Sequence, residues 1–95
     1  MYSIISKRVW EIIETINKIE QSYYNKCIDN NLIKYLKKQL INFNATINNE
    51  YIKTDIYMLL KYHIYYNMSL LDIVHIRQFF YGLQAGYKLY YLGGV

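Results

Sequence analysis

Apolar residues in the first third of the chain recur at intervals of three and four residues, which is the spacing of one side of an α-helix. These residues are Ile5, Val9, Ile12, Ile16, Ile19, Tyr23 and Cys27. Ile13 lies beside Ile12 and widens the apolar stripe, which favours burial in a bundle over a two-stranded coiled coil. Glu14 and Lys18 form a favourable charge pair on the opposite side. The pattern predicts a first helix over residues 3–28, with Cys27 as a small apolar residue on its buried side.

Three further helices are predicted, over residues 31–45, 51–66 and 70–92. Asp29 can cap the second helix, and the asparagine-rich run 42–49 is expected to form the main loop. Ser69 and Asp72 have the spacing of a capping box, and two glycines at positions 93 and 94 are typical of a helix end. A chain of 95 residues is long enough for one domain. We therefore expect a single domain over residues 1–95, all-α, folded as a compact bundle of three to four helices.

The last predicted helix contains three small residues, Gly82, Ala85 and Gly86, which we call the glycine notch. A glycine inside a helix costs about 1 kcal/mol relative to alanine, so a compensating close approach of another backbone is expected. Between Asp72 and the end of the chain only Arg77 and Lys88 are charged, which is typical of a helix that is buried or shared with a partner. We expect this helix to be the central element. The first helix is the favoured neighbour of the notch, and the same notch of a second subunit is the alternative.

Composition excludes a disordered chain, because 54% of the residues are hydrophobic and only 19% are charged. Thirteen tyrosines are abnormal for 95 residues. Tyrosine can seal the edge of a core while its hydroxyl group reaches water, and it is also enriched in protein interfaces. Codons rich in A and T account for part of the excess. For the interface alternative, the candidate contact residues are Tyr57, Tyr62, Tyr65 and Tyr66 on the third helix.

Residues that could support catalysis or bind a metal do not cluster in the sequence. His63 and His75 fall on different predicted helices, and His63 shares a side with Leu59 and Leu60, which predicts a core or boundary position. No metal-ligand spacing and no phosphate-binding loop is present. We therefore expect no enzymatic activity, no metal and no cofactor. The N-terminus lacks the pattern of a signal peptide and no segment is apolar enough for a membrane span, so a cytoplasmic location is expected.

Lysines on the second predicted helix suggest an alternative function. Lys34, Lys37 and Lys38 are spaced so that they lie on one side of that helix, where they could follow a phosphate backbone. Tyr35 could stack on a base. The net charge of +4 is modest for a nucleic-acid-binding protein, and lysine clusters often serve solubility alone. Nucleic-acid binding is therefore the second hypothesis.

The segment from Phe79 to Leu89 reads FFYGLQAGYKL. It resembles the closing helix of small all-helical proteins of Firmicutes and their phages, which end in a phrase of the form F-x-Y-G-x-x-x-G-x-x-L. The resemblance implies an all-helical accessory protein and assigns no catalytic residue. By analogy of size and composition with small anti-CRISPR proteins, the first hypothesis is a protein-binding inhibitor of a host enzyme or defence nuclease. A homodimeric structural module that uses the last helix is the third.

Overall fold

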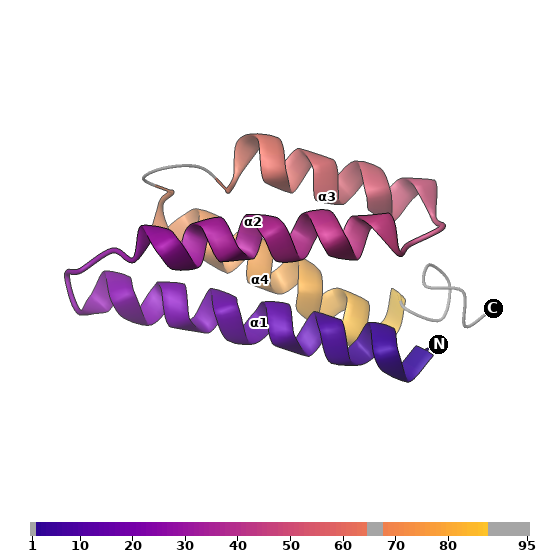
Figure 1. Ribbon diagram of the computed structural model, residues 1–95, viewed down its shortest axis with the longest axis horizontal. Coiled ribbons are helices and arrows are strands. Elements are labelled where there is room, and N and C mark those ends of the chain that lie inside the picture. The colour runs from indigo at the N-terminus through magenta and orange to yellow at the C-terminus, as the bar shows by residue number, and fades with distance from the viewer. Residues whose placement is uncertain (1, 65–67, 88–95) are drawn as a thin grey trace.

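The computed structural model describes residues 2–64 and 68–87, and every regular element in these ranges is helical (Figure 1). The elements are α1 (Tyr2–Tyr24), α2 (Asn30–Ala45), α3 (Glu50–Tyr62), α4 (Leu70–Gly82) and a π-helical turn, η1 (Leu83–Tyr87), that continues α4. The predicted all-α bundle is confirmed. Of the predicted last helix, residues 88–92 lie outside the described residues, and so do Tyr65 and Tyr66 at the predicted end of the third helix.

Side-chain caps fix the start of each of the last three helices. Asp29 Oδ1 accepts hydrogen bonds from two backbone N–H groups of α2 at 3.0 and 3.3 Å. Asn49 Oδ1 does the same for α3 at 2.9 and 3.1 Å. Ser69 and Asp72 form the predicted capping box, in which each side chain accepts from the backbone N–H of the other residue. Because these caps satisfy N–H groups that have no partner inside the helix, they place the boundaries within one residue of the prediction.

The end of α1 differs from the prediction. The helix stops at Tyr24, and Lys26 adopts a left-handed conformation with φ of 58°. The N–H groups of Lys26 and Cys27 then donate to the carbonyls of Tyr23 and Ser22, both at 3.0 Å, which is the pattern of a Schellman motif. Cys27 is therefore exposed after the helix end, and its predicted place on the buried side of the helix is wrong.

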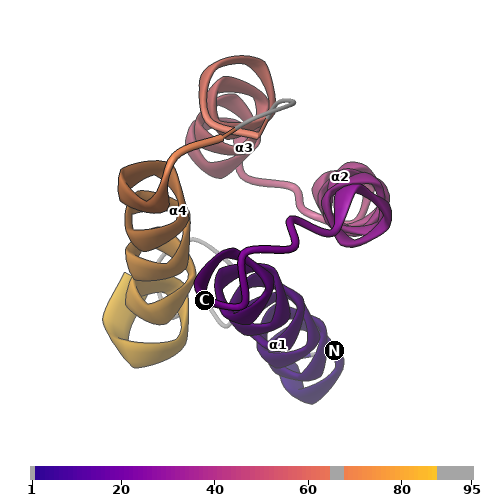
Figure 2. The ribbon, with the colours of Figure 1, turned by 90° about the vertical axis from the view of Figure 1, so that its left-hand side faces the viewer.

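The four helices surround one shared core, and α1 contributes the largest share of it (Figure 2). The helix packs against both α2 and α4, whereas α3 packs mainly against α2. Six aliphatic residues of α1 are buried, while α4 itself buries three residues. Phe80 of α4 meets Phe43 of α2 edge to face across the core, with ring centroids 6.1 Å apart. Among the described residues, the expectation that the last helix is central is therefore wrong.

Polar contacts between α1 and α4 orient the last helix. Arg77 donates to both carboxylate oxygens of Glu20, at 2.7 and 3.0 Å, and to Asn17 Oδ1 at 3.0 Å. In η1, directly after α4, Gln84 exchanges two hydrogen bonds with Ser6, of 2.9 and 2.8 Å. These contacts fix which side of α4 and η1 faces α1.

No helix in the described part of the chain combines the length and the apolar content that a membrane crossing requires.

Candidate protein-binding surface

The outward side of α4 is apolar although it is exposed. Ile73, Ile76 and Phe80 are buried in the core. Leu71 lies on another side of the helix and is 80% exposed. We call the outward side, with its continuation into η1, the α4 surface. It consists of Leu70, Leu71, Val74, Gln78, Tyr81 and Ala85, all of them exposed. Single exposed apolar residues are common, but a contiguous group of them is typical of an interaction site.

The two formally charged side chains of α4 itself are bonded to residues outside the α4 surface. Arg77 is held by Glu20 on the α1 side, and Asp72 is bonded to His63 and Ser69. None of the six side chains of the α4 surface carries a formal charge. Trp10 of α1, also exposed, meets Tyr81 edge to face with ring centroids 6.1 Å apart. The apolar surface therefore continues from α4 onto the neighbouring helix.

A groove follows the edge of the α4 surface that faces α3. One hollow of about 420 Å³ lies near the start of α3 and is lined by residues that include Tyr51, Phe79 and Gly82. A second hollow, of about 300 Å³, lies near the start of α4 and is lined by residues that include Leu71 and His75. Gln78 lines both hollows, so the two hollows adjoin each other along the seam between α3 and α4. We call this seam the α3–α4 groove.

The α3 wall of the groove is also rich in apolar side chains. Tyr51, Asp55, Met58 and Tyr62 are spaced by four, three and four residues, which places them on one side of α3. Tyr51 and Asp55 line the first hollow, which identifies this side as the one next to α4. Tyr51 is 76% exposed, and Met58 and Tyr62 are exposed as well. Because α3 packs mainly against α2, its α4 side stays open.

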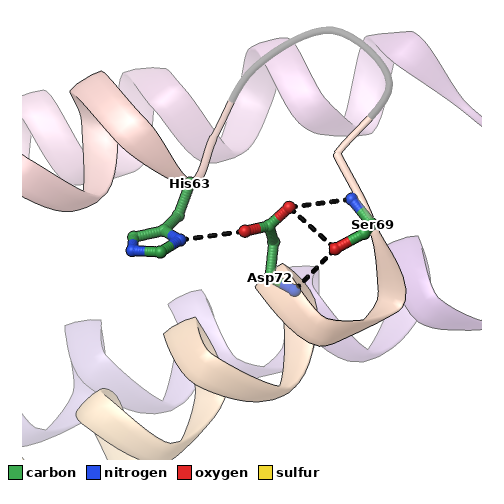
Figure 3. A network of polar contacts seen from close by, with 3 residues as sticks. All are labelled: His63, Ser69 and Asp72. Atoms are coloured by element: carbon green, nitrogen blue, oxygen red, sulfur yellow. Dashed lines mark hydrogen bonds and ion pairs between the residues drawn. The ribbon is translucent and has the colours of Figure 1, made fainter.

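A polar network ties the end of α3 to the start of α4 at one end of the groove (Figure 3). The Nδ1 atom of His63 lies 2.9 Å from Asp72 Oδ1, while Asp72 Oδ2 accepts from the backbone N–H and the hydroxyl of Ser69, both at 2.9 Å. The ring of His75 lies beside that of His63, with centroids 4.5 Å apart. Sequence analysis correctly predicted a boundary position for His63, which is half-buried, but it missed this cluster because the two histidines lie on different helices.

The chemistry of this network is that of a structural cap. The Ser69 hydroxyl donates to the carboxylate of Asp72, and in the described part of the chain no hydrogen bond joins it to a histidine. A nucleophile needs a base within hydrogen-bond reach, and here the carboxylate lies between the two groups. The described residues contain no cluster of three or more His, Cys, Asp or Glu side chains that could hold a metal ion.

The predicted tyrosine contact residues fall on two sides of α3. Tyr57 and Tyr62 are both exposed, and the Nζ atom of Lys61 lies 5.9 and 5.3 Å from the centroids of their rings. By its spacing Tyr62 shares the groove side with Tyr51, whereas Tyr57 does not. Tyr65 and Tyr66 lie outside the described residues. Tyr51 and Met58 were not among the predicted contact residues, although the four-, three- and four-residue spacing of Tyr51, Asp55, Met58 and Tyr62 was visible in the sequence.

The expected contact of the glycine notch with α1 stays a prediction, because only Gly82 and Ala85 have described surroundings. Ala85 is exposed, and Gly82 lines the hollow that faces Tyr51 of α3. The described contact of η1 with α1 is made by Gln84, which bonds Ser6, while Leu83 enters the core. Nothing is described of the surroundings of Gly86. Gly82 and Ala85 therefore flatten the outward side of the helix, so that a further molecule could approach its backbone closely.

The three lysines of the second hypothesis lie on α2 and are not among its buried residues. Lys34 and Lys38 are exposed and Lys37 is half-buried. They do not adjoin the α4 surface, because α2 and α4 are on opposite sides of the bundle (Figure 2).

The chain matches no protein-family model, and no curated protein or solved structure is significantly similar to it.

Proposed function

We propose that this protein is a non-enzymatic protein-binding module that covers a surface of a larger protein with the α4 surface and the α3–α4 groove. One observation carries the proposal: the outward side of α4 exposes a contiguous set of uncharged side chains, with Leu71 80% exposed. The specific form that we propose is a phage or mobile-element inhibitor of a host enzyme or defence nuclease that acts in the cytoplasm. Small size, composition and the sequence resemblance of the segment from Phe79 to Leu89 support that form by analogy.

The groove suits an amphipathic helix of the partner. From Tyr51 to Tyr62 the α3 wall runs for about 16 Å at 1.5 Å per residue, which accommodates about three helical turns. Such a ligand inserts apolar residues at intervals of three and four along its length. Full burial of a side chain such as Leu71 contributes about 1.5–3 kcal/mol, and the aromatic rings of Trp10 and Tyr81 are of the type that dominates binding energy.

A charge placed on the α4 surface tests the proposal. Leu71→Glu should abolish capture of the partner, because the carboxylate would have to be desolvated in an apolar contact. Ile41→Glu is the matched control, since Ile41 of α2 is an exposed aliphatic residue on the far side of the bundle. Both variants are compared with the wild type by affinity capture and mass spectrometry in nuclease-treated lysate of the host.

The expected result is one partner bound by the wild type and by Ile41→Glu but not by Leu71→Glu, with equal thermal unfolding of all three. Equal capture by Leu71→Glu would contradict the proposal. Light scattering separates the homodimer alternative: a dimer at micromolar concentration that Leu71→Glu converts to a monomer would assign the α4 surface to a second copy of the chain.

A further inference from the structure

Lysines from two helices gather on the side of the bundle away from the α4 surface. Gln39 Nε2 donates to the backbone carbonyl of Glu11 at 3.5 Å, which marks the side of α2 that faces α1. Lys34 and Lys38 of α2 are exposed to solvent, and Lys37 is half-buried. On α3, Lys53 and Lys61 lie one helical turn before and after Tyr57, and Lys61 also borders the α3–α4 groove, because its Nζ atom lies 5.3 Å from the centroid of the Tyr62 ring. We call this set the basic surface: Lys34, Lys37, Lys38, Lys53 and Lys61.

The basic surface has no acidic counterpart. Helix α2 contains no acidic residue at all. Of the two acids of α3, Glu50 lies in the first turn and Asp55 lines the hollow next to α4. The two ion pairs found among the described residues, Glu20–Arg77 and His63–Asp72, involve no lysine. Five positive charges on two adjacent helices repel one another, so the arrangement does not serve folding and is complementary to a polyanion.

An exposed aromatic ring lies among these charges. Tyr57 is 56% exposed, and Lys53 and Lys61 flank it four residues away on either side. The Nζ atom of Lys61 lies 5.9 Å from the centroid of the Tyr57 ring. Lysines that contact phosphates and an aromatic side chain that stacks on a base are the combination by which proteins hold single-stranded nucleic acid. A duplex offers no unstacked base to such a ring.

We propose that the basic surface binds single-stranded nucleic acid, with its lysines on the phosphates and Tyr57 stacked on a base. From Lys53 to Lys61 the surface extends for about 12 Å along α3, which is long enough for more than one phosphate of a single strand. If all five lysines contact phosphates, the logarithm of the affinity falls with the logarithm of the salt concentration with a slope of about −3.5. The affinity then drops about 100-fold between 50 and 200 mM salt. This proposal does not rest on the proposed protein-binding surface, although the two surfaces meet where Lys61 adjoins Tyr62.

The test measures fluorescence anisotropy of a labelled twenty-nucleotide oligo-dT with the full-length protein. Neutralising three exposed lysines of the basic surface (Lys34→Gln, Lys38→Gln and Lys61→Gln together) should weaken binding at least tenfold at 50 mM salt. The matched control neutralises three exposed lysines elsewhere (Lys7→Gln, Lys18→Gln and Lys26→Gln together) and has the same net charge. This control should stay within about twofold of the wild type. Circular dichroism verifies that both triple variants keep the helical content of the wild type.

The contribution of Tyr57 is tested separately. Tyr57→Ala should weaken oligo-dT binding about tenfold, within the range reported for loss of one stacked base, while Tyr57→Phe should retain it. Equal losses in the two triple variants would show that only net charge matters and would overturn the proposal. Tighter binding to a matched DNA duplex, binding to phosphatidylserine vesicles in place of oligo-dT, or no binding at 50 mM salt would overturn it as well. Capture of the protein partner through the α4 surface stays intact in all these variants.

Discussion

The contact between Glu20 of α1 and Arg77 of α4 should make the stability of the bundle depend on pH. Two hydrogen bonds of 2.7 and 3.0 Å join the guanidinium group to the two carboxylate oxygens, and the side chains are only 22% and 20% exposed. An exposed ion pair contributes 0–1 kcal/mol and a hydrogen bond to a charged group about 1.5–3 kcal/mol. For a bidentate pair at this depth we expect about 1.5 kcal/mol, which corresponds to a Tm change of about 10 °C in a domain of this size.

The sign of the pH dependence follows from the hydrogen bonds. They stabilise the ionised carboxylate and lower the pKa of Glu20 below its ordinary value of 4.5, although partial burial opposes the effect. Because the pKa of Glu20 is lower in the folded state than in the unfolded state, the contribution is complete above about pH 4.5. It is lost as the pH falls through the lowered pKa of the folded protein. Glu20→Gln should therefore destabilise the protein by about 1.5 kcal/mol at pH 7 and by much less at pH 2.5.

Urea denaturation followed by circular dichroism at both pH values measures this difference. Glu14→Gln is the control, because Glu14 is exposed on the same helix and belongs to neither of the described ion pairs; its effect should stay within about 0.5 kcal/mol. A double-mutant cycle with Arg77→Met isolates the pairwise free energy. An equal loss at pH 7 and pH 2.5, or a coupling free energy near zero at pH 7, would refute the assignment of this stability to the ion pair.

Three further substitutions test the local account of the fold by thermal or urea unfolding. Ser69→Ala removes the cap of α4 and should cost about 1 kcal/mol, so an unchanged Tm would show that the capping box does not contribute. Phe80→Ala opens a cavity at a fully buried position and should cost about 3–5 kcal/mol, whereas a loss below 1 kcal/mol would contradict the packing against Phe43. Lys26→Gly should stabilise the protein by up to about 1 kcal/mol, because glycine adopts the left-handed conformation without a steric penalty; destabilisation would argue against the Schellman motif.

Features that depend on neighbouring residues were predictable from the sequence. The spacing of Ile5 to Ile19 predicted the buried side of α1, and Asp29 and Ser69 predicted the starts of two helices, because a cap acts within three residues of itself. The position at which α1 ends was predicted wrongly. Lys26 takes the left-handed position that glycine usually occupies, so the sequence carries no signal for it.

The orientation of α4 could not be predicted, because a helix that is apolar on nearly all sides has no preferred buried side. Leu71 and Val74 are as apolar as Phe80, and only the tertiary structure shows that Phe80 is buried while Leu71 and Val74 are exposed. Arg77 finds Glu20 fifty-seven positions earlier in the chain, and this contact turns Leu71 outward. The predicted candidate site changed accordingly: Tyr62 and Gly82 flank the groove, while the exposed side of α4 emerged only from the tertiary structure.

Site-specific photo-crosslinking in host cells tests most directly whether the α4 surface is a protein interface. A benzophenone side chain is placed at position 71 in one variant and at position 14, on the exposed side of α1, in the other. The account predicts one discrete adduct from position 71 and none from position 14, and the mass of the adduct shows whether the partner is another protein or a second copy. The absence of an adduct at position 71, or the same adduct from both positions, would contradict it.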